Sequence, residues 1–191
     1  MSLFAEATPE ELFSLAPFVV ALISFAIYGY AIKKVFSREH GVDLRMKLLQ
    51  MLGAIFALAH LWYLWRSGSQ NYSLHVAALI FYVAGLGAFV AAIRALKGYR
   101  LTLAFSPDAP KTLIDQGIYG YIRHPFYLAY SLTWIGGVVA APSLVTAVST
   151  LIMVVFYVSA ARIEERKFLS TELAPSYELY RHRTGMLWPR V

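Results

Sequence analysis

The chain has 191 residues, no cysteine and a net charge of +6, and it is 59% hydrophobic but only 15% charged. About a quarter of the residues in a soluble domain are charged, and the absence of cysteine excludes disulfides, thiolate catalysis and cysteine-ligated metals. Basic loops that face anionic lipid headgroups account for the positive charge of a membrane protein, so we expect no nucleic-acid partner.

The chain begins with acidic residues, Glu6, Glu10 and Glu11. A signal peptide begins with a basic region, so we expect the first apolar segment to remain in the protein. A membrane-spanning helix needs about 20 apolar residues. Uncharged stretches supply three single spans, and a fourth stretch is long enough for two helices, with turn residues such as Pro142 in its middle. The predicted spans are residues 12–32, 46–65, 74–93, 126–141 and 143–161.

Basic residues divide unevenly between the two sides of this five-span arrangement. Sixteen of the 17 lysines and arginines lie in or next to the loop after the first span, the loop 97–125 and the tail 162–191, and Arg66 lies on the other side. The positive-inside rule then places the N-terminus outside and these three segments in the cytoplasm. We therefore expect one all-α integral membrane domain over residues 1–191. Its last two spans form a helical hairpin, and the loop 97–125 and the tail, which continues as a helix, form its catalytic part.

Two polar clusters flank the predicted hairpin. Arg123, His124 and Pro125 stand where the fourth span begins, among several aromatic residues. Proline is favoured in the first turn of a helix, and the aromatic residues fit either an interfacial belt or a slot for a planar cation. Glu164 and Glu165 stand at the cytoplasmic end of the fifth span. Adjacent helical positions point about 100° apart, so we expect one of the two to face the interior, where a carboxylate needs a partner or a ligand.

Histidines toward the opposite side of the bundle do not predict a metal site. His60 and His75 have no acidic residue near them in the sequence, so we interpret them as structural residues. The chain also lacks an HExxH zinc motif and a Gly-rich phosphate loop. We therefore expect no metal.

The run from Thr112 to Tyr127 resembles the signature of the isoprenylcysteine carboxyl methyltransferase family, to which the phosphatidylethanolamine methyltransferases are related. The signature reads G-x-Y-x-x-x-R-H-P-x-Y and begins here at Gly117. Paired glutamates follow about 40 residues later, and a Tyr-x-x-Tyr pair with a basic residue follows them. These last positions are matched by Tyr177, Tyr180 and Arg183. The resemblance covers residues 100–191, whereas the first hundred residues are similar only as apolar spans.

The resemblance implies an enzyme that transfers a methyl group from S-adenosylmethionine to a lipophilic acceptor that enters from the bilayer. Isoprenylcysteine-like carboxylates, phospholipid amines and other lipids all remain open as acceptors. By position, His124 and Tyr127 are implied to contact the cofactor, and Glu164 or Glu165 is implied to hold its amino group. The other residues implied in the cofactor site are Tyr119, Pro125, Tyr177 and Tyr180.

For catalysis, the resemblance implies Arg123, Glu165 and Arg183. Arg123 would pair with a carboxylate on the cofactor or the acceptor, and Arg183 would lie near the acceptor. A carboxylate acceptor needs no general base, whereas an amine or thiol acceptor needs one, for which His124 or a glutamate is at hand. Phe126 stands where small residues are frequent in the eukaryotic members of the family, which leaves the acceptor open.

Two other functions remain open at this point. An NADPH-dependent reductase of the sterol-reductase type has a similar C-terminal region, and Arg100, Lys111 and Arg123 could supply its phosphate site. A transporter, or another membrane protein without enzymatic activity, is the third hypothesis. Transporters carry ionisable residues near the middle of their spans, and such residues are almost absent here. We therefore rank the methyltransferase first and the transporter last.

Overall fold

The computed structural model describes residues 9–37, 44–67, 71–102, 104–105 and 108–190. Glu6, from the acidic start of the chain, lies outside these ranges. So do three positions of the loop 97–125 and the last residue of the tail.

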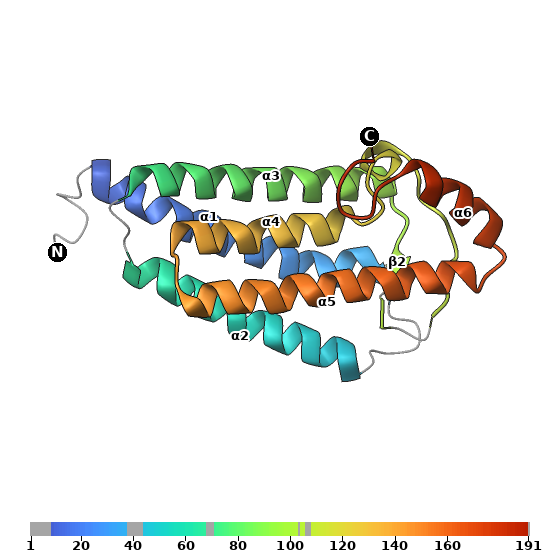
Figure 1. Ribbon diagram of the computed structural model, residues 1–191, viewed down its shortest axis with the longest axis horizontal. Coiled ribbons are helices and arrows are strands. Elements are labelled where there is room, and N and C mark those ends of the chain that lie inside the picture. The colour runs from blue at the N-terminus through green and yellow to red at the C-terminus, as the bar shows by residue number, and fades with distance from the viewer. Residues whose placement is uncertain (1–8, 38–43, 68–70, 103, 106–107, 191) are drawn as a thin grey trace.

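In the described ranges, five apolar helices run along the long axis of the molecule (Figure 1). Four of them are long and apolar enough to cross a membrane, whereas α4 has 16 residues. A helix of that length reaches about 24 Å, less than the roughly 30 Å of a hydrocarbon core. The prediction of an all-α integral membrane protein with about five apolar helices is confirmed. The bounds are α1 Pro9–Val35, α2 Leu44–Ser67, α3 Tyr72–Leu96, α4 Pro125–Ala140 and α5 Leu144–Leu169.

Successive helices alternate in direction, so α1, α3 and α5 end where α2 and α4 begin (Figure 1). The segment between α3 and α4 and the C-terminal segment both lie at this end, on the right of Figure 1. The described parts of the basic segments thus gather at one end of the bundle, which we call the polar end. Which side of the membrane the polar end faces stays a prediction.

A tight turn joins α4 to α5 at the opposite end. The backbone N–H of Ser143 donates to Thr146 Oγ1, and the backbone N–H of Thr146 donates to Ser143 Oγ, both at 3.1 Å. This reciprocal capping satisfies two N–H groups that would otherwise have no partner at the start of α5. The two helices can therefore form the hairpin that the sequence predicted, with α4 packed between α3 and α5 (Figure 1).

Short elements close the polar end. β1 (Phe36–Ser37) pairs in parallel with β2 (Leu101–Thr102), so the chain leaving α3 is tied to the end of α1. The 3-10 helix η1 (Gly117–Gly120) then packs on α3. Gly117 has φ +60°, and a Cβ built on it would lie 3.0 Å from the Cβ of Ala95, so this close approach requires glycine.

The final helix and the tail complete this end. α6 (Ala174–Arg183) follows α5, and the chain then turns back toward the start of α4. The backbone N–H of Arg123 donates to the Gly185 carbonyl at 2.8 Å, and that of His124 donates to the Met186 carbonyl at 3.1 Å. Backbone pairing with the tail therefore fixes the segment that carries Arg123 and His124.

Candidate active site

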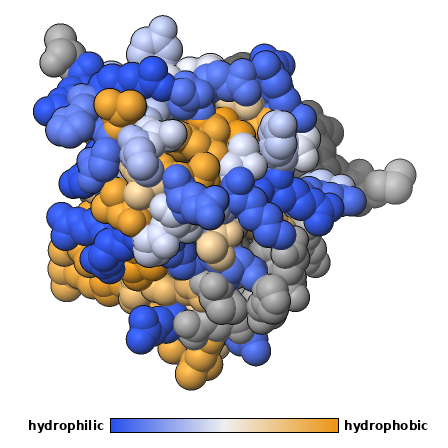
Figure 2. All heavy atoms as spheres, turned by 90° about the vertical axis from the view of Figure 1, so that its right-hand side faces the viewer, coloured by the Kyte–Doolittle hydropathy of each residue, from blue (hydrophilic) through white to orange (hydrophobic). Residues whose placement is uncertain are grey.

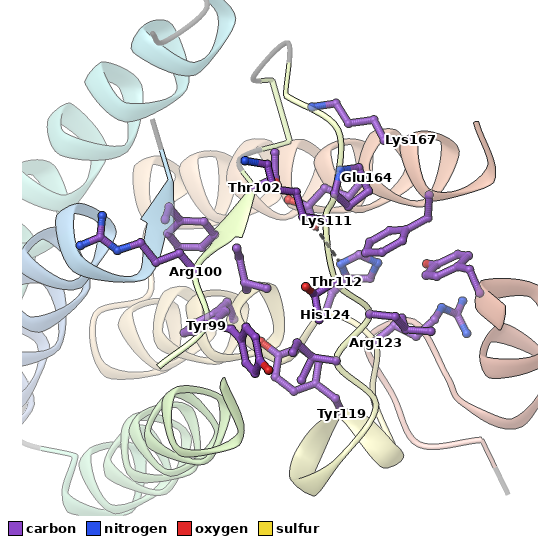
Figure 3. Close-up of a pocket in the computed structure, with 18 of the residues that line it drawn as sticks. Tyr99, Arg100, Thr102, Lys111, Thr112, Tyr119, Arg123, His124, Glu164 and Lys167 are labelled. Atoms are coloured by element: carbon purple, nitrogen blue, oxygen red, sulfur yellow. Dashed lines mark ion pairs between the residues drawn. The ribbon is translucent and has the colours of Figure 1, made fainter. Parts of the chain in front are cut away.

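A cavity of about 650 Å³ opens at the polar end. Its walls come from β1, the segment leading into β2, the loop 108–114, η1, the start of α4, the end of α5, and α6 (Figure 3). Figure 2 looks onto this end, where hydrophilic residues spread over the face and hydrophobic residues show between them. Sites for small molecules and cofactors have volumes of about 300–1,000 Å³, so the cavity can hold a ligand of that class.

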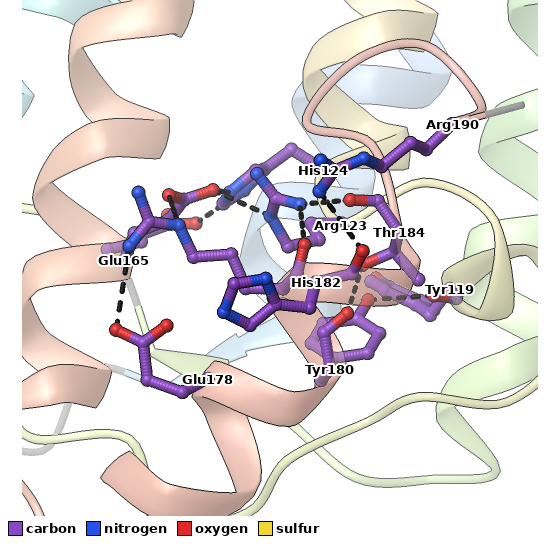
Figure 4. Close-up of polar contacts among 11 residues, drawn as sticks. Tyr119, Arg123, His124, Glu165, Glu178, Tyr180, His182, Thr184 and Arg190 are labelled. Carbon is purple, nitrogen blue, oxygen red and sulfur yellow. Dashed lines mark hydrogen bonds and ion pairs between the residues drawn. The ribbon is translucent and has the colours of Figure 1, made fainter.

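Arg123 and Glu165 form a buried ion pair beside this cavity. Arg123 Nε lies 2.8 Å from Glu165 Oε1, and the two side chains are 9% and 8% exposed. Arg123 Nη1 also donates to the Thr184 carbonyl and, at 3.2 Å, to the Arg181 carbonyl (Figure 4). A buried charge is tolerated when it is paired and hydrogen-bonded in this way. Arg123 thus joins the end of α5, the end of α6 and the tail.

His124 lies between the two glutamates. Its Nδ1 is 3.3 Å from Glu164 Oε2, and its Nε2 is 3.3 Å from Glu165 Oε1. Burial alone would lower the pKa of His124, but the hydrogen bonds and charges of both glutamates outweigh it, so the pKa is raised above its ordinary value. Because an imidazolium donates from both nitrogens, the protonated ring bridges the two carboxylates.

The two glutamates occupy different positions. Glu164 lines the cavity and accepts a hydrogen bond of 2.6 Å from the hydroxyl of Tyr127. Glu165 is 6% exposed, is not among the residues that line the cavity, and also lies 3.8 Å from Arg181 Nε. The sequence predicted different environments for the two but did not say which was which. In the structure Glu164 is available to a ligand, and Glu165 belongs to the ion network behind it.

The aromatic residues implied by the resemblance meet at the same cavity. Tyr119, Tyr127, Tyr177 and Tyr180 line it together with Pro125. The Tyr180 hydroxyl donates to the Tyr119 carbonyl at 2.8 Å, which ties α6 to η1. Burial raises the pKa values of Tyr119, Tyr177 and Tyr180, so these side chains are neutral phenols at physiological pH.

Arg183 lies outside the cavity walls. Its side chain is 61% exposed, it forms an ion pair with Asp115, and its guanidinium lies 5.8 Å from the centre of the Tyr180 ring. These contacts tie α6 to the loop before η1. That Arg183 lies near the acceptor remains a prediction.

The sequence analysis did not name several residues of the cavity wall, among them Phe36, Lys167 and Phe168. Lys167 and Phe168 follow Glu164 by three and four positions, so they share its helical face, and this spacing could have identified them. The ring of Phe168 stacks on Tyr177 with centroids 4.6 Å apart. No pattern in the sequence could have identified Phe36, because its position depends on the pairing of β1 with β2.

Comparison with known families separates the hypotheses. The family model described as phospholipid methyltransferase matches residues 73–175, more than half of the chain. The chain belongs to the phospholipid methyltransferase family. The matched segment includes α3, α4 and α5, with Arg123, His124 and both glutamates inside it. No curated protein matches the chain individually. The resemblance read from the signature is therefore confirmed at the level of the family, and membership supports a membrane methyltransferase.

Proposed function

We propose that this member of the phospholipid methyltransferase family transfers a methyl group from S-adenosylmethionine to a lipophilic acceptor. The position of Glu164 is the observation that carries the proposal. It is a carboxylate on the α4–α5 side of a cofactor-sized cavity, held in place by Tyr127 and His124. A carboxylate in that position can bind an ammonium group, and the amino-acid part of S-adenosylmethionine carries one.

The remaining cavity walls suit the other parts of this cofactor. Aromatic rings of Tyr119, Phe168 and Tyr177 line the cavity. Aromatic rings attract a sulfonium and stack on an adenine ring without introducing a fixed anion beside the reacting centre. Lys111 lines the same cavity and supplies positive charge for the carboxylate of the cofactor.

The reaction requires mainly that the protein orient the two reactants. When bound, the cofactor supplies an already activated methyl group, so the site has to align two reactants and exclude water. Tyr127 and His124 fix the Glu164 carboxylate from two directions, and Glu165, which is itself paired with Arg123, holds the other nitrogen of His124. A carboxylate acceptor needs no base, whereas an amine acceptor needs one.

The acceptor is proposed to come from the membrane. The cavity is bounded by Phe36, Leu101 and Phe126 and lies at the ends of helices long and apolar enough to span a bilayer. We place the polar end in the cytoplasm on the strength of the basic residues gathered there. A tag at the C-terminus is then expected to be inaccessible from outside intact cells, and labelling from outside would reverse this orientation.

The reductase hypothesis is less well supported by the same geometry. It needs Arg100, Lys111 and Arg123 to converge on one phosphate group. The guanidinium of Arg123 is occupied by Glu165 and by carbonyl groups at the α6 side. Figure 3 shows the side chain of Arg100 extending toward the opposite side, near β1.

Calorimetry on the purified protein in detergent tests the proposal. We expect S-adenosylmethionine to bind, S-adenosylhomocysteine to compete for the same site, and NADPH not to bind. Binding of NADPH without binding of either sulfur compound would remove the methyltransferase from consideration.

A further inference from the structure

A second hollow lies on the other side of Arg123, between α6 and the tail. Its volume is about 500 Å³, and its charged lining consists of Arg123, Arg181, Arg190 and Glu178, together with His182 (Figure 4). Three arginines therefore face one glutamate across it. Arg123 also lines the larger cavity, so the two hollows share this side chain.

The positive charge of this hollow is only partly compensated. Glu165 neutralises Arg123, and Arg181 lies 3.6 Å from Glu178 and 3.8 Å from Glu165. Arg190 Nη1 donates to the carbonyl of His182 at 3.0 Å, and within the described ranges Arg190 pairs with no carboxylate. Arginine side chains with this geometry recognise phosphate, because the planar guanidinium presents several donors to its oxygens. The hollow thus suits a phosphate group.

The hollow lies beside the start of the apolar helix α4. Its floor, the tail around Gly185, is bonded to the backbone just before α4, where the apolar bundle begins. Exposed hydrophobic side chains lie close to its lining residues in the chain: Leu179 is 74% exposed, Trp188 is 73% exposed and Tyr121 is 68% exposed. Tryptophan and tyrosine gather at the height of lipid headgroups, where one part of the side chain is apolar and the other is wet.

We propose that this hollow binds the phosphate of an anionic phospholipid headgroup, with Trp188 seated in the membrane interface beside it. The site lies on the other side of Arg123 from the cavity assigned to the cofactor and acceptor, and it does not depend on the reaction that the protein catalyses. The charge of the hollow favours an anionic lipid over a zwitterionic one, because the second carries its own cation. Attraction of this kind weakens as salt screens it.

Native mass spectrometry can test the site by counting lipids retained on the purified protein. The protein is offered phosphatidylglycerol, which has no amine to be methylated, or phosphatidylcholine. We expect retention of one phosphatidylglycerol in preference to phosphatidylcholine. Arg190→Gln and Arg181→Gln should each weaken this retention about fivefold, the usual contribution of one basic residue at a membrane surface. Glu178→Gln should strengthen it, because it removes the glutamate from the lining.

Arg94→Gln is the matched control, since Arg94 is an exposed arginine at the end of α3 that lines neither hollow. Equal loss in Arg94→Gln and Arg190→Gln would show a general basic belt and overturn the site. Unchanged retention in Arg190→Gln, Arg181→Gln and Glu178→Gln would overturn it as well. If Arg181→Gln fails to fold, the variants Arg190→Gln and Glu178→Gln still test the site.

Trp188→Ala separates a lipid from a soluble phosphate. A lipid seated in the interface should be retained more weakly by this variant, whereas inorganic phosphate should compete equally in both proteins. If Trp188→Ala retains phosphatidylglycerol fully and inorganic phosphate displaces it at millimolar concentration, the ligand is a soluble phosphate and the lipid assignment is wrong.

Discussion

The two ends of the bundle organise their polar groups in opposite ways. At the end with the α4–α5 turn, His60 Nε2 is hydrogen-bonded to Ser149 Oγ at 2.8 Å, and the His60 ring meets Trp134 edge-on with centroids 4.8 Å apart. A Cβ built on Gly137 would overlap His60 Nδ1, so helix α4 passes directly against the imidazole. Side-chain packing fills this end.

At the polar end, ion pairs set the positions of the buried charged side chains. Arg123, His124 and Glu165 are held by charged hydrogen bonds, and Glu164 is left at the wall of a cavity. The polar side chains are thus fixed by close packing at one end of the bundle and by ion pairs at the other. Substitutions at the two ends should therefore differ in whether stability or ligand affinity changes.

The largest effect is expected from Arg123→Ala. Removing this guanidinium leaves Glu165, whose side chain is 8% exposed, without its closest partner. Breaking a buried pair in this way costs about 3–5 kcal/mol, which denaturation in mixed detergent micelles would measure. Arg183→Ala is the control, because its exposed pair with Asp115 is worth about 1 kcal/mol or less. Equal losses in both variants would mean that ion pairing does not organise the polar end.

Glu164→Gln should change affinity more than stability. A hydrogen bond to a charged group contributes about 1.5–3 kcal/mol, so the affinity for S-adenosylhomocysteine should fall roughly tenfold or more in calorimetry. Glu165→Gln should lower stability more than affinity, because the Glu165 carboxylate pairs with Arg123 and His124 and does not line the cavity. Glu172→Gln, an exposed change in the α5–α6 turn, should affect neither quantity. Identical profiles for Glu164→Gln and Glu165→Gln would contradict the division between them.

Gly137→Ala tests the end of the bundle that contains the α4–α5 turn. The added methyl group would overlap the His60 ring, and overpacking of this kind costs about 1–3 kcal/mol. We expect a lower midpoint of thermal unfolding with unchanged affinity for S-adenosylhomocysteine. Gly87→Ala is the matched control, because a Cβ at that position meets nothing within 4 Å. Loss of affinity at temperatures where Gly137→Ala is folded would show that the two ends are not independent.

The local patterns of the sequence predicted much of this arrangement. Uncharged runs located the helices, and the Arg123-His124 pair with the two glutamates located the polar end, because each signal lies within one segment. The different environments of Glu164 and Glu165 depend on how α5 is rotated about its axis against α4. The sequence of either helix alone does not predict this rotation. The contacts of Phe36 and Gly185 join residues far apart in the chain, so they depend on the assembled fold. Arg123 donates to the backbone carbonyl of Thr184, and a contact with the backbone cannot be predicted from residue type.

The smallest effect concerns the protonation of His124, since no atom is removed. Its pKa in the folded protein lies above the value of about 6.5 expected in an unfolded chain, because Glu164 and Glu165 stabilise the imidazolium more than burial opposes it. A raised folded pKa contributes stability that is fully present below the unfolded value and is lost as pH rises through the folded value. The thermal midpoint of the wild type should therefore decline above pH 6.5 relative to that of His124→Gln, which cannot titrate there. Parallel pH profiles would show that His124 is neutral between its two glutamates and that Arg123 is then the main cation of the polar end.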